Sequence, residues 1–176
     1  MTVVVVYESM YGNTHRITEA VSQGLIEAGA PAEVLSVEAA PELGLHPADV
    51  LVAGAPTHVH GLSRAPTWEA AVRDAPGHDL EVDPSAQEEG VREWLGTLDA
   101  DGGRAAAFDT RVKAPAVLTG RASQAIAKAL RRHGYELVAE PESFLVTSDH
   151  QLLPEEEARA RQWGAELAAT IRSVQS

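Results

Sequence analysis

Runs of apolar residues alternate along the chain with segments in which apolar residues recur every three or four positions. Residues 2–8 (TVVVVYE) are a continuous β-branched run, which is typical of a strand buried on both faces. In residues 17–28 the apolar side chains recur at helical spacing. Because strand-like and helix-like segments keep alternating, the pattern predicts an α/β fold around a parallel sheet.

The pattern predicts five strands and a helix after most of them. We expect strands at 2–8, 32–37, 48–56 and 104–110, and a fifth within 135–146 that is interrupted or bent near Pro141. We expect helices within 17–28, 91–98 and 122–133, and a last helix that opens at Pro154 and turns Ala160, Trp163, Gly164, Leu167, Ile171 and Val174 inward. Residues 62–87 hold three prolines and indicate a long loop of the kind that covers binding sites.

Composition limits the classes of protein that this chain can represent. Its 176 residues, 44% hydrophobic and without a long apolar span, indicate one soluble domain over residues 1–176. We find no signal peptide or membrane anchor at the N-terminus, so we expect a cytoplasmic protein without a membrane partner. Because the chain has no cysteine, redox chemistry requires a bound cofactor. The net charge of −12 disfavours nucleic acid as a partner.

The turn SMYGNT (9–14) joins the first predicted strand to the first helix, where open α/β sheets bind ligands. Gly12 can adopt backbone angles that other residues avoid, and Ser9, Asn13 and Thr14 place short polar side chains beside the helix N-terminus. These residues are suited to a phosphate cradle, with simple helix capping as the alternative. Neither the GxxxxGK[ST] motif nor a three-glycine dinucleotide fingerprint is present here, so ATP and a Rossmann-bound NAD fit poorly.

The stretch VVVVYESMYGNTHRIT resembles the start of a flavodoxin, in which the loop after the first strand holds the phosphate of FMN. The resemblance extends over nearly the whole chain, because GAPTHVHG (54–61) and FDTR (108–111) follow the third and fourth predicted strands, where flavodoxins contact the flavin ring. It implies a flavodoxin-like three-layer fold with a five-stranded parallel sheet in the order 2-1-3-4-5, and FMN as the cofactor.

Matching positions assign three groups of residues to FMN by this resemblance. The phosphate group would be wrapped by Ser9, Met10, Tyr11, Gly12, Asn13 and Thr14. One side of the ring would be flanked by Pro56, Thr57, His58, Val59, His60 and Gly61. The other edge of the ring would be approached by Asp109, Thr110 and Arg111. Trp68 is the candidate for an aromatic side chain that covers the ring.

The pair His58 and His60 has other interpretations. A His-x-His pair can ligate a metal, but no cysteine or clear cluster of acidic residues completes a site nearby in the sequence. We therefore favour an imidazole that hydrogen-bonds to the flavin or stacks near it, with two ordinary polar loop residues as the alternative.

Residues 69–101 hold ten acidic and two basic side chains, a net charge of −8 and most of the excess in the chain. This segment is either a solvated face or a docking surface for a basic redox partner. We predict an FMN-binding electron-transfer protein, and favour a carrier over a stand-alone enzyme. The alternatives are an FMN-dependent NAD(P)H oxidoreductase of a small acceptor such as a quinone, and a flavin-free interaction scaffold.

Overall fold

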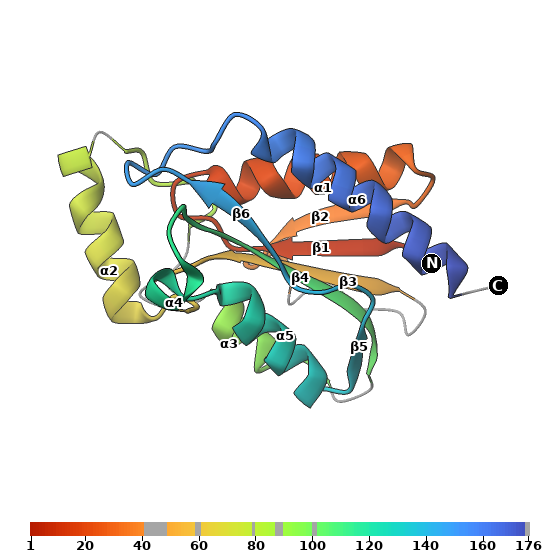
Figure 1. The fold of residues 1–176 in the computed structure, drawn as a ribbon. Coiled ribbons are helices and arrows are strands. Elements are labelled where there is room, and N and C mark those ends of the chain that lie inside the picture. Colours follow the sequence, from red (N-terminus) through yellow and green to blue (C-terminus); the bar gives the residue numbers. More distant parts are fainter. Residues whose placement is uncertain (41–48, 59–60, 79, 87–89, 100–101, 175–176) are drawn as a thin grey trace.

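In the computed structural model, the strands form one parallel sheet with helices on both faces (Figure 1). The structure describes residues 1–40, 49–58, 61–78, 80–86, 90–99 and 102–174. The strands are β1 (Val3–Tyr7), β2 (Ala32–Ser36), β3 (Val50–Pro56), β4 (Gly103–Val112), β5 (Tyr135–Leu137) and β6 (Glu142–Val146). The helices are α1 (Asn13–Glu27), α2 (Ala65–Asp74), α3 (Val91–Leu95), α4 (Ala116–Thr119), α5 (Ala122–Arg132) and α6 (Glu156–Ser173), and a 3-10 helix, η2, spans Ala75–His78.

The sheet has the order β2-β1-β3-β4, and the last position is shared by β5 and β6. Both of these short strands run parallel to β4: β5 pairs with its first residues and β6 with its last. The break between them ends at Pro141, which has no N–H group to donate to the ladder. The structure therefore confirms the predicted order and the predicted interruption of the fifth strand.

Strand β1 shows why its sequence is apolar at every position. Val3 and Val5 belong to the core cluster that packs against α1 and α6. Val4 and Val6 point to the opposite face and join the cluster packed against α3 and α5. Since successive residues of a strand face opposite sides, helices on both faces bury the whole run (Figure 1).

Helices α1 and α6 pack at a very short distance through two glycines. A Cβ atom on Gly24 would lie 1.9 Å from the carbonyl oxygen of Arg161, and one on Gly164 would lie 2.2 Å from that of Val21. Any side chain at either position would force the helices apart. The two glycines therefore fix the separation of these helices, which together cover one face of the sheet (Figure 1).

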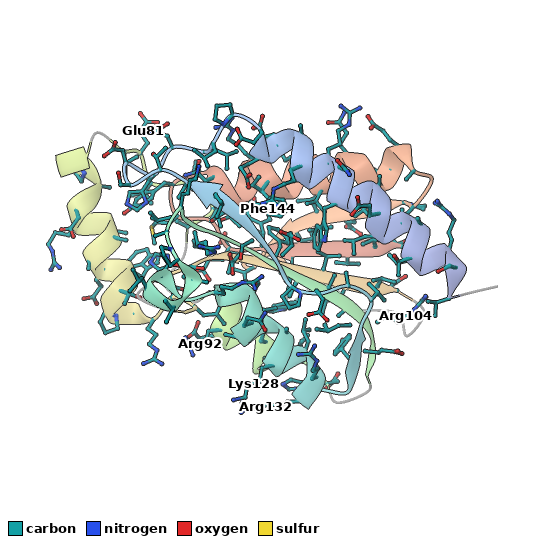
Figure 2. All side chains as sticks on the ribbon, in the orientation of Figure 1. Glu81, Arg92, Arg104, Lys128, Arg132 and Phe144 are labelled. Atoms are coloured by element: carbon teal, nitrogen blue, oxygen red, sulfur yellow. The ribbon has the colours of Figure 1, made fainter. Side chains whose placement is uncertain are left out.

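An aromatic cluster fills the core beneath α6. The rings of Phe108, Phe144 and Trp163 lie pairwise 6.0 Å apart, edge to face. Figure 2 shows Phe144 in the interior of the molecule, whereas Lys128 and Arg132 project outward from α5. Because edge-to-face aromatic pairs add to the stability gained by burial, this cluster helps to anchor β6 against α6.

The expectation of a long loop at 62–87 was wrong, because the segment contains α2 and η2. Pro66 lies in the first turn of α2, where the missing N–H group has no intrahelical acceptor to lose. Thr67 caps the same turn: its hydroxyl oxygen accepts from the Arg64 amide at 2.8 Å and donates to the Arg64 carbonyl at 2.9 Å. Pro76 follows the helix end, so these two prolines mark the limits of a helix.

The C-terminal helix α6 largely follows the predicted pattern. Its inward residues Ala160, Trp163, Gly164, Leu167 and Ile171 are buried. Val174 is 62% exposed, contrary to the prediction, because it lies beyond the last residue of α6. Among the described residues, no helix combines the length and apolar character that crossing a membrane requires.

Candidate functional site

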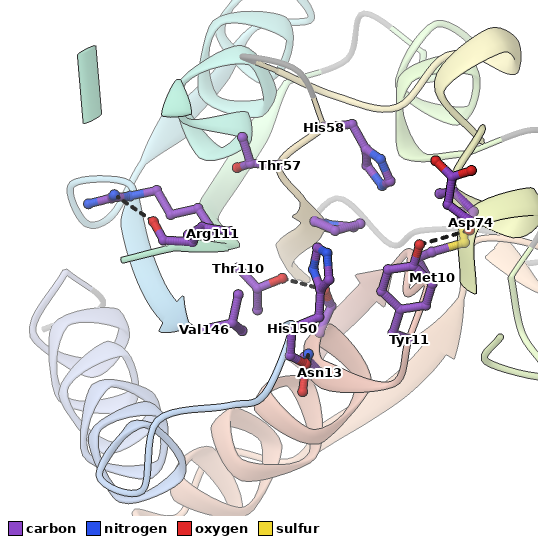
Figure 3. A pocket seen from close by; sticks show the side chains of 14 residues that line it. Met10, Tyr11, Asn13, Thr57, His58, Asp74, Thr110, Arg111, Val146 and His150 are labelled. Carbon is purple, nitrogen blue, oxygen red and sulfur yellow. Dashed lines mark hydrogen bonds between the residues drawn. The ribbon is translucent and has the colours of Figure 1, made fainter. Parts of the chain in front are cut away.

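A pocket with a volume of about 250 Å³ opens at the carboxyl ends of β1, β3 and β4 (Figure 3). Its walls come from the turn 9–14, the segment after β3, the end of β4, the loop after β6, and α2. It is lined by Met10, Tyr11, Asn13, Thr14, Pro56, Thr57, His58, Ala71, Asp74, Thr110, Arg111, Val112, Val146 and His150. The pocket adjoins the point between β1 and β3 where the strand order reverses, which is the usual ligand position in such sheets.

The turn before α1 is held in shape by its own side chains. Gly12 has a φ angle of 85°, in the left-handed region that glycine adopts most easily. The buried hydroxyl oxygen of Ser9 accepts from the amide of Gly12 at 3.1 Å and from that of His15 at 3.4 Å. Ser9 and Gly12 therefore shape the turn from behind and do not line the pocket.

The first turn of α1 presents two amides that have no hydrogen-bond acceptor among the described residues. The N–H groups of Asn13 and Thr14 precede the first intrahelical hydrogen bond, so the helix itself cannot satisfy them. Within the described part of the chain, no other group accepts a hydrogen bond from either amide. Both residues line the pocket, and the positive end of a 15-residue helix lies behind them. This arrangement fits a bound anion such as a phosphate group.

Hydrogen bonds join the segments that surround the turn. The hydroxyl oxygens of Thr14 and Thr110 lie 2.8 Å apart, which links α1 to the end of β4. The Thr57 amide donates to the Thr110 carbonyl at 2.8 Å, and the Thr57 hydroxyl oxygen accepts from the Ala122 amide at 3.0 Å. The turn 9–14 with Thr57 and Thr110 forms what we call the strand-end wall of the pocket.

Two side chains that line the pocket, His58 and Arg111, carry nitrogen atoms without a hydrogen-bond partner among the described residues. Burial, aided by the charge on His150, lowers the pKa of His58 from 6.5 to about 4. The Nε2 atom of His58 and the Nε atom of Arg111 are both shielded from solvent and have no hydrogen-bond partner in the described part of the molecule. Nη1 of Arg111 donates to the Ala114 carbonyl at 2.8 Å, which directs the guanidinium toward α4.

Most of the residues assigned by resemblance meet at this pocket. Those that line it are Met10, Tyr11, Asn13, Thr14, Pro56, Thr57, His58, Thr110 and Arg111. Gly61 lies beside the pocket and exchanges two backbone hydrogen bonds with His58, of 2.7 and 2.8 Å. Val59 and His60 lie outside the residues that the structure describes. Trp68, the candidate covering aromatic, is on α2 but is not among the lining residues.

Asp109 lies elsewhere than the sequence predicted. Its side chain is completely buried, and Oδ2 accepts a hydrogen bond of 2.8 Å from the Ser123 amide in the first turn of α5. Burial raises the pKa of this carboxyl group. Thr110 faces the pocket, and its neighbour Asp109 faces α5, because adjacent residues of a strand point to opposite sides. Asp109 is therefore a helix-capping residue outside the pocket.

Five pocket residues were not predicted: Ala71, Asp74, Val112, Val146 and His150. The hydroxyl of Tyr11 donates to the Ala71 carbonyl at 2.9 Å, which brings α2 to the pocket. The carbonyl of His150 accepts from the Asn13 side-chain amide at 2.6 Å. These contacts join residues 60 and 137 positions apart in sequence, so no local pattern could have revealed them.

One member of the acidic segment 69–101 supports the turn from outside. The Asp83 amide donates to the Met10 carbonyl at 2.6 Å, and Asp83 Oδ2 lies 3.4 Å from Nδ1 of His15. Burial opposes the charge on Asp83, but hydrogen bonds from Ser85 and the charge of His15 outweigh it and lower its pKa. Asp83 is therefore a buried part of the structure, while Glu69, Asp74, Glu81, Glu93 and Asp99 are exposed.

Comparison with known proteins was informative only at the level of structure. No protein-family model matches the sequence, and no curated protein matches it. An archaeal flavodoxin superposes with a TM-score of 0.64 at 18% identity, over 98% of this chain and 99% of the other. Flavodoxin 1 of Bacillus cereus gives a TM-score of 0.61 at 19% identity, over 96% and 98% of the two chains.

A third structure, the WrbA-like flavodoxin of Agrobacterium tumefaciens, gives a TM-score of 0.59 at 23% identity, over 98% of both chains. All three matches extend over nearly the full length of both chains. Together with the strand order and the two helical layers, they show that this chain has the flavodoxin-like fold.

Proposed function

We propose that this chain binds FMN in the pocket and transfers electrons through it. The observation that carries the proposal is the pair of amides of Asn13 and Thr14. They have no acceptor in the described part of the chain and open onto a pocket at the switch point of the sheet. A phosphate group bound there would accept both hydrogen bonds and lie at the positive end of α1. The resemblance of SMYGNT to the flavodoxin phosphate loop supports the same assignment.

Different residues of the pocket would hold the phosphate and the ring of FMN. The amides of Asn13 and Thr14 and the Thr14 hydroxyl would hold the phosphate, which is close to a dianion at neutral pH. Pro56, Thr57 and His58 would lie against the flavin ring. The bound flavin supplies the redox chemistry, which a chain without cysteine does not have in its own side chains. The chain itself would hold and orient the ring.

Substitution of Thr14 by alanine tests the phosphate assignment. A charge-assisted hydrogen bond contributes roughly 1.5–3 kcal/mol, so Thr14→Ala should weaken FMN binding about ten- to a hundredfold. Riboflavin has no phosphate, and its affinity should change little. Dissociation constants for both ligands can be measured by quenching of flavin fluorescence.

Thr110→Val is the matched control. Like Thr14→Ala, it removes the hydrogen bond between the hydroxyls of Thr14 and Thr110, but it leaves the Thr14 hydroxyl in place. We expect it to keep the wild-type ratio of riboflavin to FMN dissociation constants. An equal loss of both ligands in Thr14→Ala, or no binding of FMN by the wild type, would contradict the proposal.

A second candidate is an FMN-dependent NAD(P)H oxidoreductase of a small acceptor such as a quinone. Tyr11 is the one Phe, Trp or Tyr side chain among the described lining residues, and the others include two imidazoles and Arg111. A ring that is not clamped between aromatic side chains leaves a face accessible to a small acceptor. Turnover of NADPH and a quinone without any added protein would favour this enzyme.

A carrier instead requires a redox partner protein. Glu69 and Asp74 on α2 are exposed, as is Glu81 beyond it, and Asp74 lines the pocket. We propose that these carboxylates steer a partner with a basic docking surface toward the pocket. Electron transfer that requires such a partner and slows as salt is added would favour the carrier over the enzyme.

A further inference from the structure

His58 is held at the pocket by two backbone hydrogen bonds to Gly61. Its amide donates to the Gly61 carbonyl at 2.7 Å, and the Gly61 amide donates back to the His58 carbonyl at 2.8 Å. The side chain faces the interior of the pocket (Figure 3), and Nε2 is shielded from solvent without a partner among the described residues. An imidazole nitrogen in this position can bind a proton or a ligand atom within the pocket.

A second imidazole lines the same pocket. His150 has a φ angle of 58°, its carbonyl accepts from the Asn13 side chain, and its ring lies 5.1 Å from that of Tyr11. Burial disfavours a charge on His58, and a charge on His150 disfavours it further. Because these two effects lower the pKa of His58 to about 4, His58 is neutral at neutral pH in the free protein.

The other charged groups of the pocket offset one another. Arg111 from the end of β4 contributes a positive charge, and Asp74 from α2 contributes a negative one. Tyr11, from the turn before α1, has a pKa raised by burial and by Asp74, so it stays neutral. Of the described groups that line the pocket, only His58 and His150 are of a type that changes charge readily near neutral pH.

We propose that His58 takes up a proton when the flavin in this pocket is reduced. The inference rests on the proposed function. Two electrons from a redox partner protein and one proton from solvent convert oxidised FMN to its anionic reduced form. A second proton from solvent binds the imidazole of His58, which becomes an imidazolium. The new positive charge offsets the negative charge on the reduced ring, so the pocket as a whole gains no net charge.

The physical argument is the change in charge at the ring. An opposite charge within about 4–6 Å shifts a pKa by roughly one to three in favour of the charged form. A reduced ring at such a distance from His58 would move the pKa of His58 from about 4 toward neutrality. His58 is better placed than a solvent-exposed group to respond, because a shielded nitrogen feels the ring charge with little screening.

Nuclear magnetic resonance of the holoprotein tests the proton uptake directly. The imidazole resonance of His58, assigned by its loss in His58→Gln, is followed from pH 5 to 9 with FMN oxidised and with FMN fully reduced by dithionite. We expect the resonance to stay constant when FMN is oxidised and to titrate with a pKa about two higher when FMN is reduced. Identical behaviour in the two states, or titration of His150 alone, would overturn the proposal.

The redox potential provides a second readout. For a two-electron couple, uptake of one proton changes the midpoint potential by about 30 mV per pH unit, and uptake of two by about 59 mV. The wild type should therefore show nearly twice the slope of His58→Gln between the pKa values of His58 in the oxidised and the reduced protein. His133→Gln, at the far end of α5, is the control and should keep the wild-type slope. Failure of the wild type to bind FMN would overturn the proposed function. If both proteins bind FMN and their midpoint potentials change equally with pH, only this inference is overturned.

Discussion

The two sides of the pocket are built in different ways. The strand-end wall, formed by the turn 9–14 with Thr57 and Thr110, is joined by a buried hydrogen bond between hydroxyls and by backbone hydrogen bonds between strand ends. On the opposite side, α2 has no buried residue along its whole described length. It is attached to the turn through the hydrogen bond from Tyr11 to the Ala71 carbonyl.

This difference indicates which part of the site positions a ligand and which part opens to admit it. The strand-end wall keeps the amides of Asn13 and Thr14 in position before any ligand arrives, because the sheet and α1 hold them. Helix α2 has little apolar burial to lose, and segments of this kind open locally at low free-energy cost. We therefore expect a ligand to enter past α2 and to be positioned by the strand-end wall.

The largest expected effect comes from the packing behind the strand-end wall. A Cβ atom at position 164 would lie 2.2 Å from the Val21 carbonyl oxygen, so Gly164→Ala must push α1 and α6 apart. We expect a loss of about 3 kcal/mol in the free energy of unfolding. The midpoint of thermal unfolding should fall by roughly 6–12 °C.

Gly77→Ala is the matched substitution on the α2 side, since a Cβ atom there would meet no atom of the described residues within 4 Å. Its free energy of unfolding should stay within about 0.5 kcal/mol of the wild type. Equal destabilisation by the two substitutions would show that the two regions do not differ in packing.

The prediction from sequence succeeded where short-range patterns reflect burial. The valines of β1 face cores on both sides, and Gly12 has the left-handed backbone conformation expected for the turn. The sequence prediction failed for α2. Prolines such as Pro66 and Pro76 are typical of loops, but proline also occurs in the first turn of a helix and just after its end.

A smaller effect is expected from loosening α2. Tyr11→Phe removes the hydrogen bond to the Ala71 carbonyl and keeps the ring beside His150. A hydrogen bond of this kind contributes about 1 kcal/mol, so the amides of α2 should exchange with solvent about fivefold faster. The amides of α1 serve as the internal control and should exchange at the wild-type rate. Unchanged exchange in α2, or faster exchange in both helices, would contradict the proposed attachment.

The smallest effect is a change in the pH dependence of stability at Asp109. Burial raises its pKa in the folded state, so ionisation costs the folded state more than the unfolded one. Stability therefore falls as the pH rises from the ordinary aspartate pKa, near 4, through the raised value. Asp109→Asn should remove this fall, which urea denaturation between pH 4 and 8 measures.

The affinity of Asp109→Asn for FMN should stay within about twofold of the wild type, because the side chain lies beneath α5 and outside the pocket. A large loss of FMN would return Asp109 to the site that the sequence assigned to it. Equal slopes of stability against pH in the wild type and in Asp109→Asn would likewise contradict the buried position of Asp109.

The site was predictable only where its residues follow strand ends in sequence. Thr14, Thr57 and Thr110 each lie just beyond or at the carboxyl end of a predicted strand, and the topology brings them together. His150 lies in the turn after β6 and itself has a left-handed backbone conformation. It reaches the pocket through its contact with Asn13. Such contacts depend on how loops pack in three dimensions, which alternation of apolar and polar residues does not record.

The most direct test of the account is the phosphorus resonance of FMN bound to the protein. The phosphate group of free FMN changes its charge near pH 6. If the amides of Asn13 and Thr14 hold it as a dianion at the N-terminus of α1, its resonance should be shifted from that of free FMN and remain constant between pH 5 and 8. A phosphorus resonance of bound flavin that titrates as in free FMN would contradict the claim that the strand-end wall binds the phosphate.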